Sequence, residues 1–341
     1  WSFADAKVPG RPVSLIAADS LVGFGGKSFL TFYGVNLRSS DIDLGTARRL
    51  APAVVVPGRL SAVGTLNGPL RDVVFRGTAT QRDGQLPAST VRGMVHLDTR
   101  GAVLALDTDL DLDPLSFAGI RGGFPSLKTR GDVRGHVKLA GTMDQLAVDA
   151  TLAGELGAVE VHGGLSLVPP KLGADALQVR FTRLDLAALR GSGRTTRLNG
   201  LMLATGSTDT LRAPSGRLDL SLARSRVREW TIDTLYTRLA VIDSVIHLDT
   251  LYTEWKGARA GGSGTLGWAR PHDGTIGLQV TLDSLAGFDS LALALTGQVR
   301  DTARHAQLPL AGTGSAHVTL AGSLDTLRVQ GEFGLRNFAF L

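Results

Sequence analysis

Histidine is the side chain best suited to bind a metal ion or to move a proton near neutral pH, and the chain contains seven. They occupy positions His96, His136, His162, His247, His272, His305 and His317. No two of them have the H-E-x-x-H or H-x3-H spacing that places a pair of ligands on one helical face. We therefore expect histidines on polar strand faces, and we predict no metal site and no cofactor.

Two glycine-rich segments resemble catalytic or phosphate-binding loops. Gly23–Ser28 reads Gly-Phe-Gly-Gly-Lys-Ser, but Leu21 stands where a phosphate-binding loop requires its first glycine. We expect a glycine-rich hairpin turn there. Gly261–Gly264 is followed by Thr265 and so lacks the G-x-S-x-G pattern of a serine nucleophile. With no catalytic pair in the sequence, we predict that the protein is not an enzyme.

Four aspartates form the strongest local concentration of charge: Asp107, Asp109, Asp111 and Asp113. On a strand, their carboxylates share one face and repel one another. Calcium would relieve this repulsion, although Leu112 excludes an EF-hand loop because it occupies the place of the required glycine. We expect arginines of neighbouring strands to balance the row, with a calcium ion as the alternative.

The amino-acid composition excludes several classes of protein. The chain has 341 residues with 43 Gly, 13 Pro and no Cys, and 43% of its residues are hydrophobic. The apolar fraction is too high for disorder, no run of apolar residues is long enough for a membrane helix, and disulfides are excluded. A net charge of +5 is weak for a nucleic-acid-binding protein of this size, so we predict no nucleic-acid partner.

Apolar and polar residues alternate along most of the sequence, which predicts strands with one apolar face. The apolar positions that we predict to line a groove are Leu104, Leu106, Leu110, Leu112, Leu218, Leu220, Leu222, Ile246, Leu248, Val318 and Leu320. Core packing is the competing interpretation of these side chains. Helix is expected only in short pieces, such as Gly45–Leu50 and Leu184–Leu189.

Two short patterns recur. The segment His136–Leu146 returns as His317–Leu327, a strand that ends in Gly, a polar turn and a Leu that opens the next strand. The second pattern contains Asp with Leu or Ile and occurs at Asp41–Leu44, Asp111–Leu115, Arg183–Leu189 and Asp283–Phe288. Such internal repeats predict a repetitive β-architecture.

The expected fold is all-β: a long repetitive antiparallel sheet curled into a taco-like trough with a hydrophobic interior. We expect lead-in strands in residues 1–31 and one continuous repetitive sheet over 32–341. Its repeat units lie near 41–108, 109–182, 183–282 and 283–341. An apolar trough in water needs an occupant, and acyl chains suit it because each buried CH₂ contributes about 0.8 kcal/mol.

The recurring turns and Leu-Asp-Leu/Pro steps resemble repeats of TamB and AsmA-like bridge-like lipid-transfer proteins of the bacterial envelope, over roughly Phe32–Leu341. The resemblance implies a protein that carries phospholipid acyl chains across the periplasm, between the inner and outer membrane. It also implies an inner-membrane anchor outside this chain, which would be an internal fragment of the full-length protein. An outer-membrane barrel protein of the assembly type is the implied protein partner.

Two other functions stay open at this point. A structural or adhesive β-repeat protein, or one that aids the insertion of outer-membrane proteins, would close its apolar faces on each other or offer its sheet edges to another strand. A transmembrane barrel would turn its apolar face outward, but Trp and Tyr are too few for two aromatic girdles over this many strands.

Overall fold

The computed structural model of the chain describes residues 2–3, 8, 10–24, 30–50, 54–191, 193, 195–208, 214–228, 230–284 and 310–340. Most of the predicted turn at Gly23–Ser28 lies outside these residues, as do His305 and most of the step Asp283–Phe288. Of the described residues, 72% are in strands and 6% in helices, and the strands pair antiparallel. The predicted all-β antiparallel class is therefore confirmed.

The chain divides into two compact units, Trp1–Arg197 (unit 1) and Leu198–Leu341 (unit 2). The division falls inside one strand, β12 (Thr196–Thr208). The predicted repeat boundaries and the single sheet over 32–341 stay predictions.

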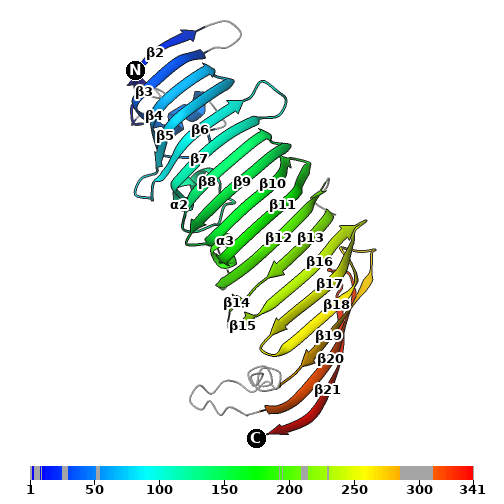
Figure 1. The fold of residues 1–341 in the computed structure, drawn as a ribbon. Helices are drawn as coiled ribbons and strands as arrows, with labels where there is room; N and C mark the ends of the chain where they lie inside the picture. The colour runs from blue at the N-terminus through cyan, green and yellow to red at the C-terminus, as the bar shows by residue number, and fades with distance from the viewer. Residues whose placement is uncertain are drawn as a thin grey trace. The chain divides into compact units, whose positions relative to one another are not determined.

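Unit 1 is an antiparallel meander in which each strand pairs with the next along the chain (Figure 1). Its strands are β1 (Ser2–Phe3), β2 (Ser14–Phe24), β3 (Leu30–Asp43), β4 (Arg59–Pro69), β5 (Asp72–Arg82), β6 (Ser89–Asp98), β7 (Ala105–Ser116), β8 (Asp132–Thr142), β9 (Gln145–Gly154), β10 (Gly157–Val168) and β11 (Lys171–Leu184). Consecutive pairing follows from the short polar turns that join most of these strands, because a tight turn returns the chain antiparallel beside itself.

Unit 2 continues the same way of pairing, with one small additional hairpin. After β12 its strands are β13 (Ser215–Leu222), β14 (Ser225–Val227), β15 (Trp230–Ile232), β16 (Thr234–Ile242), β17 (Val245–Trp255), β18 (Ala258–Gly267), β19 (Gly274–Leu282), β20 (Leu310–Gly322) and β21 (Arg328–Phe340). The short strands β14 and β15 pair with each other, so β13 pairs directly with β16. From β16 to β21 each strand pairs with the next.

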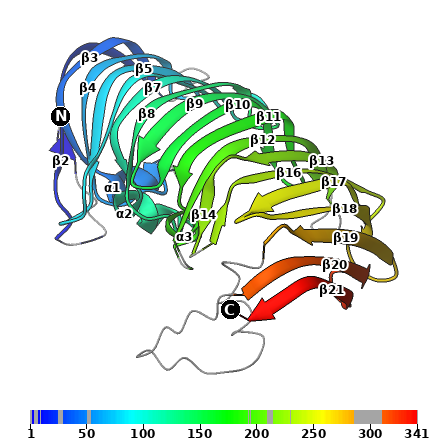
Figure 2. The ribbon, with the colours of Figure 1, turned by 60° about the horizontal axis from the view of Figure 1, so that its bottom comes forward.

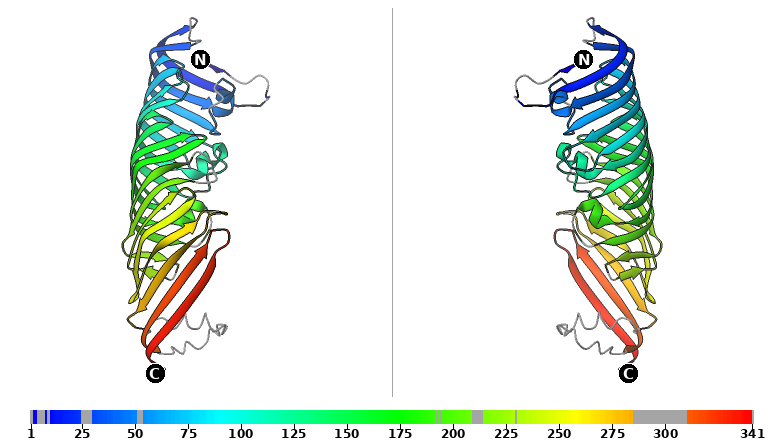
Figure 3. Two further views of the ribbon diagram at one scale, coloured as in Figure 1. Left: turned by 90° about the vertical axis from the view of Figure 1, so that its right-hand side faces the viewer. Right: turned by 90° about the vertical axis from the view of Figure 1, so that its left-hand side faces the viewer.

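Short helices interrupt unit 1 at regular intervals. They are α1 (Leu44–Leu50), α2 (Phe117–Ile120), which runs on into the 3-10 turn η1 (Arg121–Gly123), and α3 (Leu186–Arg190). These helices follow β3, β7 and β11, which are four strands apart and therefore end at the same edge of the sheet. Figure 3 shows all three on one side of the strands of unit 1.

Aspartates of the recurring sequence pattern start two of these helices. The Asp43 carboxylate accepts the backbone N–H of Thr46 at 2.8 Å, and the Asp185 carboxylate accepts that of Ala187 at 2.9 Å. Both are N-cap interactions, which supply a partner to an otherwise unpaired N–H of the first helical turn. The Leu/Ile-Asp-Leu steps at these two sites are therefore helix starts, close to the helices predicted at Gly45–Leu50 and Leu184–Leu189.

Glycines inside the strands allow the chains to bend. Gly135, in the middle of β8, has a φ of +142°, and a Cβ atom added there would lie 1.9 Å from the Thr151 carbonyl oxygen on β9. No other residue fits that backbone conformation and that close approach, so Gly135 is a fixed bend in its strand. Figure 2 shows the strands of unit 1 bowing in one direction, with α1 and α2 beneath them.

Candidate functional site: the apolar sheet faces

Cross-strand registry gathers the aliphatic side chains of unit 1 on one face, which we call the apolar face. One row of directly opposed residues crosses five strands from β7 to β11: Leu110, Val137, Ala150, Val161 and Val179. The adjacent positions along each strand point to the other side, because side chains alternate on a strand. The alternation of apolar and polar residues along each strand thus produces a continuous aliphatic surface on one face of the sheet.

The apolar face is only partly covered. On β8, Val137 and Leu139 are half-buried, whereas His136, Lys138 and Ala140 on the opposite face are exposed. Fully buried positions exist, notably Val133 at 5% exposure. In a sheet packed tightly on a second layer, the inward side chains would be buried as Val133 is. The centre of this face is therefore an aliphatic surface that the described residues shield without closing.

Unit 1 has its tightest hydrophobic cluster at the N-terminal end of the apolar face. Val35 and Leu37 of β3 and Ala62 of β4 are buried there, at 2%, 6% and 7% exposure. Partly buried side chains of β2, β4 and β5 pack against them, including Leu66 and Phe75. This cluster anchors one end of the sheet by ordinary core packing.

Along one edge of unit 1 the helices and their flanking segments form a border over the apolar face, which we call the helical border (residues 44–50 with 54–58, 117–131 and 186–191). Gln81, on the apolar face of β5, donates from its amide to the carbonyl oxygens of Pro57 at 2.8 Å and Gly119 at 3.1 Å. Thr129 donates its hydroxyl to the Leu189 carbonyl at 3.0 Å, which joins the second segment to the third. These bonds tie all three segments into one edge.

The opposite edge of unit 1 is open and apolar. Four leucines at strand ends or turns there remain exposed: Leu70 at 47%, Leu97 at 37%, Leu167 at 42% and Leu172 at 38%. We call this set the leucine edge. Several residues near the helical border, among them Leu112 and Phe181, are instead below 9% exposed. The helical border has exposed apolar side chains of its own, such as Phe124 and Leu189 at 44%, so the two edges differ in the burial of the strand residues beside them.

The structure places the predicted groove residues of unit 1 on the apolar face. Leu106, Leu110 and Leu112 lie on one side of β7, and Leu104 immediately precedes that strand. Leu112 is buried, and the other three are half-buried. Sequence reasoning missed the helical border and the leucine edge, because neither can be read from alternation within a single strand.

Unit 2 has an apolar face of its own, built by the same registry. Leu218 (β13), Leu239 (β16), Leu248 (β17), Gly264 (β18), Ile276 (β19) and Leu320 (β20) form one cross-strand row. The remaining predicted residues share its face: Leu220, Leu222, Ile246 and Val318. Leu222 is buried at 8% exposure, and the other predicted residues of unit 2 are half-buried.

The aspartate row lies on the polar face, where side chains of β8 approach three of its four members. His136 on β8 approaches the carboxylates of Asp111 at 3.0 Å and Asp109 at 3.4 Å. Arg134 contacts Asp113 at 2.9 Å. Among the described residues an arginine ion pair is found for Asp113, whereas register places His136 of β8 on one side of Asp111 and Arg92 of β6 on the other.

Arginine hydrogen bonds lower the pKa values of Asp41 and Asp98 in unit 1. The hydrogen bond from Arg59, 2.7 Å long, lowers the pKa of Asp41 despite partial burial. Asp98 accepts hydrogen bonds from the Arg100 guanidinium and backbone N–H, which lower its pKa to about 2. Both pairs lie at strand ends or turns and stabilise the charged surface of the sheet.

Among the described residues, no group of three or more His, Asp or Glu side chains is placed to hold a metal ion. None of the helices found there has the length and hydropathy to cross a bilayer. The apolar faces, one in each unit, are the candidate binding surfaces. The chain matches no protein-family model, no curated protein and no solved structure.

Proposed function

We propose that the protein is a non-enzymatic lipid-transfer scaffold whose apolar faces carry phospholipid acyl chains and shield them from water. The observation that carries this proposal is the half-buried state of aliphatic side chains such as Val137 and Leu139 in the middle of the sheet of unit 1. A continuous aliphatic surface of this kind is unfavourable in water unless an apolar ligand covers it. Acyl chains match it because they are linear, aliphatic and uncharged.

The energy available from such binding is large. Each CH₂ removed from water contributes about 0.8 kcal/mol, so a sixteen-carbon chain gains roughly 10 kcal/mol on the same scale. In the proposed mechanism the chain enters over the leucine edge and lies on the apolar face, with the helical border closing the far side. The lipid headgroup stays at the open edge, where it keeps its hydration.

The resemblance of the repeats to TamB and AsmA-like proteins supports a place in the periplasm, where a lipid moving between the two membranes must be shielded from water. We therefore propose that the chain is part of an envelope protein that bridges this gap, curled as a trough around its cargo. An outer-membrane barrel protein is the proposed protein partner on the same basis.

Native mass spectrometry of the chain purified from a bacterial host tests the proposal. We expect phospholipid to be retained by the unmodified protein. Leu139→Glu places a carboxylate on the apolar face and should lower lipid occupancy about tenfold or more, because a charge next to the acyl chain is costly. Ala140→Glu is the matched control, since the neighbouring residue is exposed on the polar face.

A second measurement distinguishes an open face from a closed core. The chain has no cysteine, so Leu139→Cys introduces a single thiol. We expect this thiol to react with a maleimide dye, and phospholipid vesicles to shift the emission of the dye to the blue. Absence of bound lipid together with an unreactive thiol would reject the proposal in favour of a structural β-repeat protein with closed layers.

A further inference from the structure

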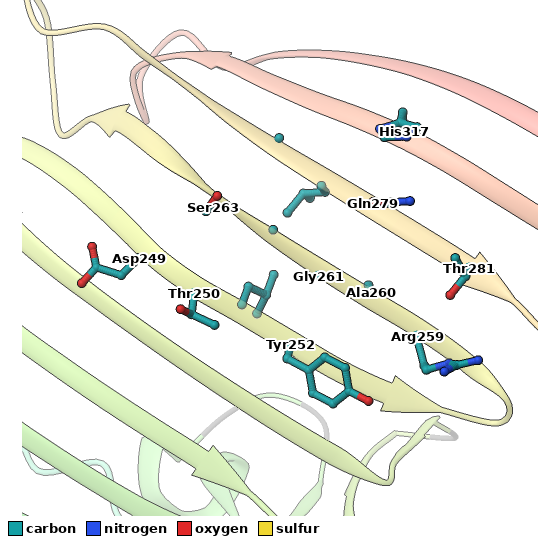
Figure 4. Close-up of a pocket in the computed structure, with 14 residues that line it drawn as sticks. Asp249, Thr250, Tyr252, Arg259, Ala260, Gly261, Ser263, Gln279, Thr281 and His317 are labelled. Carbon is teal, nitrogen blue, oxygen red and sulfur yellow. The ribbon is translucent and has the colours of Figure 1, made fainter.

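The polar face of unit 2 carries a hollow that the proposed lipid function does not use. Its volume is about 750 Å³, and it spans β17, β18, β19 and β20 (Figure 4). Its floor is built from small residues, among them Gly261, Ser263 and Gly277. Hollows of this volume fall in the range of small-molecule sites in proteins.

Cross-strand registry explains why the face is hollow at this point. Tyr252, Gly261, Gln279 and His317 are directly opposed on four successive strands. Because Gly261 has no side chain, the Tyr252 ring and the Gln279 amide are separated by two strand spacings, about 9.5 Å, with nothing between them. Figure 4 shows this gap between the two labelled side chains.

Two side chains at one end of the rim are held by hydrogen bonds, and the other polar side chains of the hollow make none to described residues. The Tyr252 hydroxyl donates to Glu254, and Arg259 donates to Asp283 at 2.7 Å, so both rim side chains are held by residues outside the hollow. The hollow is also lined by six residues whose side chains make no hydrogen bond to any other described residue: Asp249, Thr250, Ser263, Gln279, Thr281 and His317. Their donors and acceptors are therefore available to a ligand.

A bulge in β17 increases the number of polar groups that reach the hollow. The register of β17 with β18 shifts between Leu248 and Leu251, and Asp249 and Thr250 lie at that shift. Both side chains are exposed and both line the hollow. A bulge re-aims side chains in this way, so two consecutive residues serve one face.

We propose that this hollow binds a short neutral saccharide. Its polar groups include carboxylate, amide, imidazole and hydroxyl, which together donate to and accept from sugar hydroxyls. Its one carboxylate, Asp249, interacts electrostatically with Arg238, and its one guanidinium, Arg259, is paired with Asp283, which leaves no excess charge for an ionic ligand. Tyr252 supplies an aromatic ring, a flat apolar surface against which the C–H face of a sugar ring can pack.

Calorimetric titration of the unmodified protein with maltotriose, cellotriose and chitotriose tests this proposal. We expect at least one trisaccharide to bind with a Kd below about 1 mM. Tyr252→Ala should weaken that binding about tenfold or more, because the stacking surface is lost. Tyr33→Ala removes an exposed tyrosine of unit 1 (57% exposed, against 39% for Tyr252) and should leave the Kd unchanged.

Gly277→Gln provides a variant that blocks the hollow without disturbing the fold. A Cβ at Gly277 meets no atom within 4 Å, so the added side chain extends into open space on the floor. We expect it to abolish trisaccharide binding while the midpoint of urea unfolding stays the same. Binding that survives both Tyr252→Ala and Gly277→Gln, or no heat with any of the three sugars, would overturn the proposal.

Discussion

The side-chain oxygen of Ser89 accepts the backbone N–H of Ser116 at 3.0 Å, at the point where β7 ends and α2 begins. Ser89 is the first residue of β6 and is 4% exposed, and Ser116 is fully buried. The chain turns away from the ladder here, so the hydroxyl supplies the acceptor that a neighbouring carbonyl supplies elsewhere. A buried N–H without a partner would be costly at this edge.

The same arrangement occurs at the other two helices. At α1, the Ser14 hydroxyl oxygen accepts the N–H of Asp43 at 2.9 Å, and at α3 the Thr196 hydroxyl oxygen accepts that of Leu186 at 2.8 Å. Both acceptors are the first residue of a strand and both are buried. Each helix of the helical border is therefore joined to the sheet by a hydroxyl on a neighbouring strand.

Removal of the Ser89 hydroxyl should lower the free energy of unfolding. In Ser89→Ala the buried N–H of Ser116 loses its acceptor, which costs about 1–3 kcal/mol. Urea unfolding followed by circular dichroism measures the change. Ser61→Ala is the control, because Ser61 is exposed on β4, and its effect should stay within about 0.5 kcal/mol. Equal effects of the two substitutions would contradict the role of the Ser89 hydroxyl.

Gly135→Ala should destabilise unit 1 strongly. The alanine Cβ would clash with the Thr151 carbonyl, and the backbone would have to leave its φ of +142°. Such strain costs on the order of 1–3 kcal/mol, and the clash adds to it. Gly277→Ala is the matched control, since its Cβ meets open space. The prediction fails if the two variants have the same urea midpoint.

The carboxyl of Asp98 should titrate at an unusually low pH. Hydrogen bonds from Arg100 lower its pKa to about 2, so the pair stabilises the folded state above pH 4 and loses this contribution as the pH falls toward 2. NMR titration of the Asp98 carboxyl carbon measures the midpoint directly. In Arg100→Ala the midpoint should rise toward 3.8, the ordinary value for an aspartate. A midpoint near 3.8 in the unmodified protein would disprove the interaction.

The leucine edge should control how quickly lipid enters. The double variant Leu97→Lys and Leu167→Lys places two charged groups at the edge over which an acyl chain enters in the proposed mechanism. We expect the rate of uptake of a fluorescent phospholipid from vesicles to fall several-fold. Leu189→Lys alters a leucine of α3 that is 44% exposed at the helical border, and it should leave the rate unchanged. A slower rate in this control alone would place the entry on the other side.

Most of the strand architecture could be predicted from the sequence because it is local. Alternation on β7 places Leu106 and Leu110 opposite Asp107 and Asp109 whatever the neighbouring strands are. The helices α1 and α3 were also predictable, since each follows an aspartate N-cap and a short apolar segment. The recurring pattern was informative because it marks these helix starts.

What could not be predicted depends on contacts between distant residues. Helix α2 has only four residues and contains Gly119, so it is too short for a helical pattern of apolar residues to predict it. Its position depends on Gln81, whose side chain reaches two backbone carbonyls of other segments. The pairing of His136 with two aspartates, and the hollow beside Tyr252, both require the register of neighbouring strands, which a single sequence does not specify.

The four-strand interval between α1, α2 and α3 has an architectural consequence. After an even number of antiparallel strands, the chain is again at the same edge of the sheet and runs in the same direction. Its apolar side chains then point to the same face of the sheet. Each helix also brings its own anchor, so such a block depends little on the blocks beyond its neighbours. Duplication or loss of a whole block would alter only the number of strands in the sheet of unit 1, so evolution or a protein engineer could change the length of that sheet without changing its construction.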